Sequence, residues 1–336
     1  MAKTGIERID GLLAGAPGVS AVAPGDPDRE AVGAIQDLLR GLGNRSLPDV
    51  RLPSYGNFGG MTANAVRQFR STHGLPDSDA VDTACLAAMA QAKPADPMAC
   101  RSYIALALDV EIGAMTYLMT LTGLWEADAK FALLNLNTDR AGLSFGVIQW
   151  AQKPGRLKEV LDAFHDADPA RFADCFGGLV ASRMLMHVAK EYGGVDKDTG
   201  KTTDSDYDLV SDPWAGRFKS CGLDPFFQRI QVTLATTDNQ SAFDTMKSHV
   251  PLIASERGVG FLLDTANQHG PNGALSIYGA VVRQGMAEAA VLKAMRDESV
   301  RRISAQFGPT SAEAQSTVSR RDWFLSTPVL SDAALA

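Results

Sequence analysis

Hydrophobic residues along this chain recur mostly every three or four positions, which is the spacing of one face of an α-helix. The first such pattern begins after Asp28 and stops at Gly41. A second begins at Thr62, a residue type that caps helices, and ends before Gly74. A third, shorter helix is expected at about 82–89. Further helices are expected over 104–125 and near 156–166, 169–191, 224–238, 241–253, 256–269 and 285–306.

One segment departs from this spacing. Between Phe131 and Trp150, two apolar runs alternate with polar residues as strands do, around a glycine-rich bend that holds Asp139. A β-hairpin is predicted here, shortly after a helix whose end carries Glu126. Two carboxylates placed in this way are the minimum equipment for cleaving a glycosidic bond. The leading hypothesis is therefore an enzyme.

The bulk composition excludes several other classes. The chain of 336 residues is 45% apolar and 21% charged, with a net charge of −7, as is ordinary for a globular protein. No basic cluster indicates a nucleic-acid partner, and Asp109 and Glu111 within the apolar stretch 104–125 argue against an integral membrane segment. The four cysteines show no metal-ligand spacing, so neither a metal nor a cofactor is expected, although Cys85 and Cys100 could bridge in an oxidising compartment.

Two prolines in the segment AKPADPM, between helical patterns, mark a boundary between two domains. The fold class expected is mainly α, with a small three-helix domain followed by an α+β domain that has a small β-hairpin lobe. The predicted organisation is a flexible N-terminus (1–25), a small domain (26–92), a linker (93–103), a larger domain (104–325) and a loose tail (326–336).

Within residues 29–90 the small domain resembles the peptidoglycan-binding module found on many wall hydrolases. The resemblance lies in IQDLL (35–39), YGNFGGMTANAVRQF (55–69) and DAVDTACLAAM (79–89). It implies that this module binds the cell wall, and that its recognisable turn is formed around Tyr55, Phe58 and Thr62. The alternative is a small helical domain that serves only as a spacer or a partner contact.

The hairpin region resembles the lysozyme superfamily, in which a helix-borne Glu faces a small sheet across a cleft. Asp139 follows Glu126 after thirteen residues, and Gly142, Ser144 and Gly146 come three, five and seven residues after Asp139, a spacing most similar to that of chitosanases. The resemblance implies that Glu126 is the general acid and that Asp139 activates water or stabilises the transition state. Ser144 would hold that water, and Gly142 would let the sugar approach the backbone.

Either carboxylate alone has an ordinary explanation. An acidic residue such as Glu126 is common at a solvent-exposed helix end, and aspartate such as Asp139 is common in turns. Their order, with the glycine and serine spacing behind them, favours the catalytic interpretation. Glu111 is the rival acid, but the pattern places it in the middle of a helix and too far from the hairpin.

A second polar cluster lies in the segment LLDTANQHG. Asp264 and Gln268 are four residues apart and share a helix face, and His269 sits at the expected helix end. Together with Gln149 after the hairpin, these residues are candidate contacts for sugar hydroxyls. The alternative for the cluster is a helix stop with a capping histidine.

The hypothesis that joins these observations is a modular cell-wall hydrolase that cleaves β-1,4 bonds of peptidoglycan glycan strands, a muramidase. Three alternatives are a chitosanase, a lytic transglycosylase and a non-catalytic wall-binding protein. The first residues make a poor signal peptide, so synthesis in the cytoplasm is expected, followed by action on the wall after phage lysis or specialised secretion. A modular endolysin or a wall-hydrolase effector fits this setting, and an immunity or secretion partner stays unknown.

Overall fold

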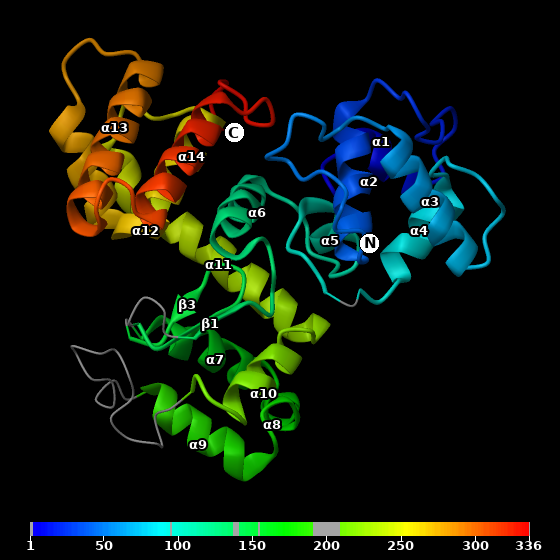
Figure 1. The fold of residues 1–336 in the computed structure, drawn as a ribbon, viewed down its shortest axis with the longest axis horizontal. Coiled ribbons are helices and arrows are strands. Elements are labelled where there is room, and N and C mark those ends of the chain that lie inside the picture. The colour runs from blue at the N-terminus through cyan, green and yellow to red at the C-terminus, as the bar shows by residue number, and fades with distance from the viewer. Residues whose placement is uncertain (1–2, 95, 137–140, 154, 191–208, 336) are drawn as a thin grey trace. The chain divides into compact units, whose positions relative to one another are not determined.

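The computed structural model describes residues 3–94, 96–136, 141–153, 155–190 and 209–335 (Figure 1). Helices dominate, and the described residues form a single three-stranded sheet, which confirms the predicted fold class. Contacts divide the chain into two compact units. Unit 1 comprises Met1–Ile112 and Glu126–Ala235, and unit 2 comprises Gly113–Trp125 and Thr236–Ala336. The division therefore does not follow the expected linker at 93–103, because each unit is built from two separate stretches of chain.

The first part of unit 1 contains five helices: α1 (Glu7–Leu13), α2 (Arg29–Gly41), α3 (Gly60–Thr72), α4 (Thr83–Gln91) and α5 (Arg101–Leu106). Asp28 caps α2 by accepting a hydrogen bond from the Ala31 amide, and Asp82 caps α4 in the same way. Thr62 was expected to cap the second helix, but the corresponding helix α3 begins at Gly60, with Gly59 as its N-cap. Thr62 lies buried in the first turn, since its hydroxyl has a partner on α2.

In place of the expected flexible N-terminus, the structure has the packed helix α1. Ile9 and Leu12 lie on one face of this helix and are buried, and Val22 pairs with Val81 in an antiparallel bridge. The expected linker likewise runs into α5, which packs against α2. These segments are short and rich in glycine and proline, but their few apolar side chains reach the core of unit 1.

The single helix expected over 104–125 is wrong. Helix α5 ends at Leu106, and α6 (Ala114–Ala127) begins only after a loop in which Asp109 has a positive φ of 56°. Asp109 and Glu111 lie in this loop and are exposed. A continuous helix would have placed both carboxylates along a largely apolar segment, where leaving water is costly.

The remainder of unit 1 surrounds the small sheet. Its elements are β1 (Leu134–Leu136), β2 (Leu143–Phe145), β3 (Trp150–Ala151), α7 (Arg156–Ala167), α8 (Pro169–Cys175), α9 (Leu179–Lys190), α10 (Trp214–Cys221) and the first half of α11 (Pro225–Met246). The helix expected over 169–191 is divided into α8 and α9 by Gly177 and Gly178, whose φ values are 91° and 95°.

Unit 2 consists of α6 up to Trp125, the rest of α11, a short 3₁₀ helix (Lys247–His249), α12 (Glu256–Val281), α13 (Glu288–Phe307) and α14 (Ala312–Ser326). Helix α12 kinks at Gly270, which precedes Pro271. In place of the expected loose tail, residues 327–335 pack on this unit. Arg257 donates hydrogen bonds to the carbonyls of Thr327 and Leu330 at 2.9 and 2.7 Å. Among the described residues, no helix is long and apolar enough to cross a membrane.

Candidate active site

Glu126 occupies the last turn of α6 and belongs to unit 1. The helix is apolar along most of its length, and its last turn ends where Asp128 and Ala129 adopt positive φ values of 49° and 57°. Two consecutive left-handed residues turn the chain sharply out of the helix and toward β1. The Glu126 side chain is half-buried, so its carboxyl group is neither enclosed in the core nor fully solvated. The catalytic role of Glu126 stays a prediction.

The predicted hairpin is present and has a third strand. Strands β1, β2 and β3 are antiparallel in that order, and Leu136 lies opposite Leu143. Asp139 lies outside the described residues, within the connection between β1 and β2. The role of Asp139 stays a prediction. Glu126 and the strands that bracket Asp139 belong to the same unit.

Two buried glutamines hold the glycines of the sheet in place. Gly142 and Gly146 have φ values of 76° and 82°, and a Cβ atom at either position would meet a glutamine Oε1 at 2.5 Å. The glutamine beside Gly142 is Gln152, whose Oε1 accepts from the Leu143 amide at 3.2 Å. The glutamine beside Gly146 is Gln231, and both are almost fully buried.

Gln231 ties helix α11 to the loops around the sheet. Its Oε1 accepts from the Val147 amide at 3.1 Å, and its Nε2 donates to the Phe131 carbonyl at 3.2 Å. The side chain thus satisfies two backbone groups, one on each side of β2 in sequence, that would otherwise be buried without partners. The sequence pattern does not single out Gln231, because its partners lie about a hundred residues away and no local signal marks it.

Of the residues predicted to contact substrate in the sheet region, Gly142 and Ser144 are buried and Gln149 is half-buried. Ser144 lies on the central strand opposite Asn135 and Ala151 and is only 2% exposed. Gln149 is half-buried, and its Nε2 donates to the carbonyls of Leu133 and Gly146 at 3.3 and 2.9 Å. Through these hydrogen bonds the Gln149 side chain stabilises the turn between β2 and β3. Roles for Ser144 in holding water, and for Gly142 and Gln149 in binding sugar, stay predictions.

An aromatic cluster packs between the sheet and helices α7, α10 and α11. The ring of Phe145 on β2 packs against Phe218 on α10 and Phe227 on α11, with centroids 5.2 and 5.5 Å apart. Phe227 in turn stacks on Phe164 of α7 at 4.4 Å. All four side chains are fully buried, so the sheet rests on three helices through large rigid side chains. Such support suits a strand that must hold polar groups in fixed positions.

The second polar cluster of the sequence lies in unit 2 and is a buried ion-pair network. Arg320 Nε donates to both carboxylate oxygens of Asp264 at 2.7 Å, and Arg321 also pairs with this carboxylate. Asp264 and Arg321 have no exposed area, and Arg320 has 4%. Asp264 thus has no surface to offer a sugar, and we assign it a structural role that links α12 to α14.

Gln268 and His269 continue this network rather than lining an open groove. Gln268 donates to Thr317 Oγ1 at 2.7 Å and accepts from Arg321 at 2.8 Å. His269 is within 2.9 Å of Ser299 Oγ on α13, and burial together with the charges of Arg302 and Arg320 lowers its pKa. A neutral histidine in a helix–helix contact is close to the alternative raised from the sequence, in which His269 serves the end of a helix.

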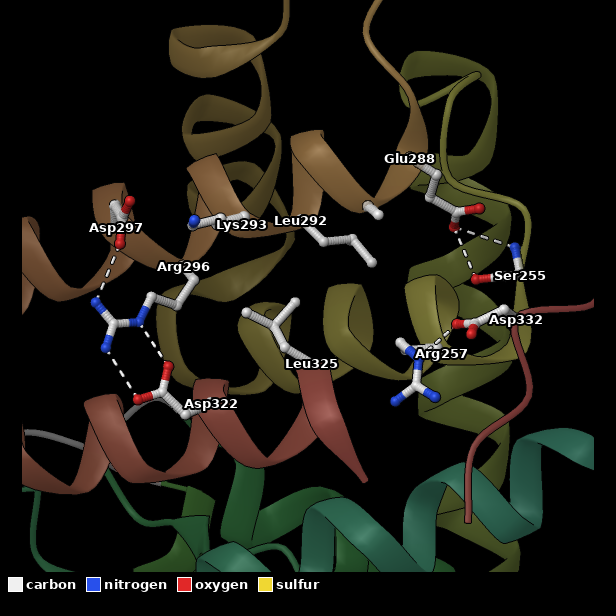
Figure 2. Close-up of a pocket in the computed structure, with 11 residues that line it drawn as sticks. Ser255, Arg257, Glu288, Leu292, Lys293, Arg296, Asp297, Asp322, Leu325 and Asp332 are labelled. Carbon is white, nitrogen blue, oxygen red and sulfur yellow. Dashed lines mark hydrogen bonds and ion pairs between the residues drawn. The ribbon is translucent and has the colours of Figure 1, made fainter. Parts of the chain in front are cut away.

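Unit 2 also holds a charged pocket of about 720 Å³ between α12, α13, α14 and the C-terminal segment (Figure 2). At one end Arg296 pairs with Asp322 and Asp297, and at the other Arg257 pairs with Asp332. Leu292 and Leu325 lie between these two ends. None of the three predicted polar residues, Asp264, Gln268 and His269, lines this pocket. Each arginine in the wall already has a carboxylate partner. The positive charges of these two arginines are therefore compensated by residues of the protein itself.

In the small helical domain, the predicted turn is organised by one glutamine. Gln36 donates to Thr62 Oγ1 and to the Asn57 carbonyl at 3.0 Å, and accepts from the Gly56 amide at 2.8 Å. Phe58 is 4% exposed, as expected for a side chain packed on the core. The turn around residues 55–62 is therefore fixed to α2 by the hydrogen bonds of Gln36. Thr62 takes part in these bonds, and Phe58 packs in the core beside them.

Tyr55 is the half-buried member of the predicted wall-binding set. Its hydroxyl donates to Asp37 Oδ2 at 2.9 Å, and burial raises the pKa of the Asp37 carboxyl to about 7. Nearby in sequence, Leu52 and Met61 expose 51% and 58% of their surfaces. Neither of these two apolar side chains stands out in the sequence pattern. Exposed apolar residues flanking a recognition turn are candidates for contact with a ligand.

Comparisons with known proteins bear on this domain first. Residues 28–89 match the family described as "Putative peptidoglycan binding domain", which confirms the resemblance predicted for residues 29–90. The chain therefore carries a peptidoglycan-binding domain. No curated protein matches the chain.

Several solved structures are similar at low identity. The native chitosanase from Bacillus subtilis MY002 is 16% identical, and the similarity covers 63% of this chain and 86% of that chain with a TM-score of 0.45. A mutant of that chitosanase complexed with 6 GlcN is also 16% identical, over 66% of this chain and 96% of the other, with a TM-score of 0.46. A structure described as a chitosanase complex is 17% identical over 65% and 91%, with a TM-score of 0.41. A likeness at this level carries no inference about activity.

Proposed function

We propose that this protein hydrolyses the β-1,4 glycosidic bonds of peptidoglycan glycan strands, a muramidase activity. The observation that carries the proposal is the peptidoglycan-binding domain at residues 28–89. In the same chain, Glu126 ends a helix immediately before a small, rigidly supported sheet. A module that binds the wall raises the local concentration of any activity joined to it, because the second encounter becomes intramolecular.

In this proposal Glu126 protonates the leaving glycosidic oxygen, and Asp139 activates the attacking water or stabilises the oxocarbenium-like transition state. Glu126 is half-buried and lies in the last turn of α6, so the helix fixes the backbone that carries the proposed acid. Asp139 lies between β1 and β2 in sequence. Gln152 and Gln231 accept hydrogen bonds from backbone amides within and just after β2. Inversion of configuration is the expected outcome, which requires the wider carboxylate separation.

The test is clearance of isolated peptidoglycan, followed by turbidity, for the wild type and two matched variants. Glu126→Gln removes the proposed acid, and we expect a fall of about 100-fold or more, since general acid catalysis contributes roughly 10²–10⁴-fold. Glu111→Gln removes the rival acid, which lies in an exposed loop, and should keep near-normal activity. Sedimentation with the wall should be unchanged for both variants, because residues 28–89 are intact.

Three results would contradict the assignment in distinguishable ways. Clearance by Glu126→Gln at more than a tenth of the wild-type rate would remove Glu126 from catalysis. Wall binding without clearance by the wild type would favour a non-catalytic wall-binding protein. Faster release of reducing ends from chitosan than from peptidoglycan would favour a chitosanase.

The second carboxylate separates hydrolysis from transglycosylation. Hydrolysis requires an activated water, so Asp139→Asn should lower the rate strongly, and the released fragments should end in reducing sugars. A lytic transglycosylase would release anhydro ends and keep much of its rate in Asp139→Asn. Mass spectrometry of the fragments distinguishes the two products.

A further inference from the structure

Two cysteines that lie far apart in sequence meet in unit 1. Cys175 is the last residue of α8, and Cys221 is the last residue of α10. The two helices pack against each other, and the Cys221 side chain is the neighbour that most lowers the pKa of the Cys175 thiol. The sequence alone suggested a different pair, Cys85 and Cys100. The fold thus brings together two cysteines whose spacing in the sequence gives no sign of a pair.

Contacts next to the thiols hold the two helix ends together. Arg171, one turn before Cys175, pairs with Asp224, three residues after Cys221. Its Nε lies 3.1 Å from Oδ1 and its Nη2 lies 2.8 Å from Oδ2, a bidentate arrangement. A disulfide requires Cα atoms within about 7 Å and correctly aimed Cβ atoms. An ion pair across the two helix ends holds them at a fixed approach, which favours that geometry.

A ring contact adds a second constraint on the same pair of helices. Phe176, the residue after Cys175, packs edge-on against Phe218 of α10 with centroids 5.1 Å apart. Both rings are fully buried. The cysteine pair therefore lies between an ion pair and a core aromatic contact, and both contacts hold the ends of α8 and α10 together.

The two thiols differ in exposure and in the direction of their pKa shifts, as expected for a nucleophilic cysteine and a resolving cysteine. Cys175 is half-buried, and the neighbouring Cys221 side chain lowers its pKa against the opposing effects of burial and Asp224. Cys221 is 2% exposed, and burial raises its pKa. The other two cysteines are less reactive, because burial raises the pKa of Cys85 to about 11 and also raises that of Cys100. Cys175 is also more exposed than Cys221, so an external oxidant reaches the Cys175 sulfur first.

We propose that Cys175 and Cys221 form a reversible intramolecular disulfide when the protein meets a disulfide oxidant. The Cys175 thiolate attacks one sulfur of the external disulfide and expels the other sulfur as a thiolate, which leaves a mixed disulfide. Cys221 then gives up its proton and attacks the Cys175 sulfur, and the second external thiolate leaves. Two protein thiols are oxidised by two electrons, and one external disulfide is reduced to two thiols.

The bond would join the ends of α8 and α10 and close the chain between them, which includes α9. Closing a loop of several tens of residues restricts the unfolded chain, so oxidation should raise the melting temperature of the protein by roughly 5–10 °C. Reduction should reverse the shift. Such a bond would stabilise the helices that support β2 through Phe218, without requiring any change at Glu126.

The experiment incubates the full-length protein with oxidised glutathione and counts free thiols by alkylation and intact mass. We expect four alkylated cysteines in the reduced protein and two in the oxidised protein, whose mass is lower by about 2 Da before alkylation because two hydrogens are lost. Proteolysis without reductant should yield one linked fragment that contains Cys175 and Cys221. Dithiothreitol should restore four thiols and the lower melting temperature.

Matched variants assign the effect. Cys175→Ala and Cys221→Ala should each lose the oxidation-dependent melting shift, whereas Cys85→Ala and Cys100→Ala should keep it. The proposal is overturned if the oxidised wild type keeps four thiols, if the linked fragment joins Cys85 to Cys100, or if the only disulfides join two chains. Fragment mapping on the wild type decides among these outcomes even if one variant does not fold.

Discussion

Replacing Asp264 by asparagine is the sharpest test of how unit 2 is held together. The carboxylate has no exposed area and faces the guanidinium groups of Arg320 and Arg321, both nearly or fully buried. Arg320 contacts it at 2.6 and 2.7 Å. Asparagine has almost the same shape, so the substitution removes the negative charge and one acceptor while leaving the packing unchanged. It leaves two buried positive charges without their counter-charge.

The expected cost follows from the burial. Removing one partner of a buried ion pair costs about 3–5 kcal/mol, because the remaining charge is left uncompensated in a medium that solvates it poorly. That is a large part of the roughly 5–15 kcal/mol by which a domain is stable. The melting temperature of unit 2 should fall by on the order of 10 °C or more.

Asp322→Asn is the matched control, because it breaks an Asp–Arg pair at the surface of unit 2, between α14 and α13. Asp322 accepts from Arg296 at 2.8 and 2.9 Å, but its side chain is 51% exposed. Exposed pairs contribute about 0–1 kcal/mol, since water solvates both charges when they separate. The control variant should therefore unfold at nearly the same urea concentration as the wild type.

Urea unfolding followed by tryptophan fluorescence measures both variants. Trp125 and Trp323 pack against each other in unit 2 with ring centroids 6.1 Å apart, so their signal is expected to report on this unit. Equal midpoints for Asp264→Asn and Asp322→Asn would refute the reasoning. If Asp264→Asn also lowered affinity for soluble glycan fragments while keeping its stability, the sugar-binding role predicted from the sequence would be correct instead.

Two further predictions concern pH and backbone strain in unit 1. Because burial raises the pKa of Asp37 from 3.8 to about 7, the folded state holds this proton more tightly, and stability should fall as pH rises from about 4 to 7. Asp37→Asn should remove that fall, so the urea midpoints of variant and wild type should diverge between about pH 4.5 and 7.5, and parallel midpoints would contradict this. Gly146→Ala should lower the melting temperature more than Gly155→Ala. Both have φ near 80°, but only at position 146 would the new Cβ meet Gln231, so equal losses would show that the contact has no effect.

Local signals in the sequence predicted the elements that depend on a few neighbouring residues. Asp28 and Asp82 cap the helices expected from them, because a cap needs only a side chain and an amide three residues away. The alternation after Phe131 predicted strands, and the register places Asp139 in their connection. The match at residues 28–89 likewise depends on a contiguous pattern, which is why the peptidoglycan-binding domain is recognisable from the order of its residues alone.

Breaks in helices were harder to predict, because tertiary contacts decide which of two acceptable conformations a loop residue adopts. Asp109 has a positive φ and separates α5 from α6, although the surrounding residues are apolar enough for one helix. The last residues looked disordered by composition, yet Arg257 from α12 binds their carbonyls. A residue some seventy positions away supplies the hydrogen bonds, and no local pattern contains it.

The sequence by itself determined that this is a mainly helical protein with a small sheet, and that residues 28–89 resemble a peptidoglycan-binding family. Only the tertiary structure decided which polar residues are structural. It enclosed Asp264 between two arginines, bound Gln231 to the backbone around the sheet, and packed the helix that ends at Cys175 against the helix that ends at Cys221. Burial and pairing are properties of contacts between distant segments, and a periodic pattern specifies which face is buried without specifying what it meets.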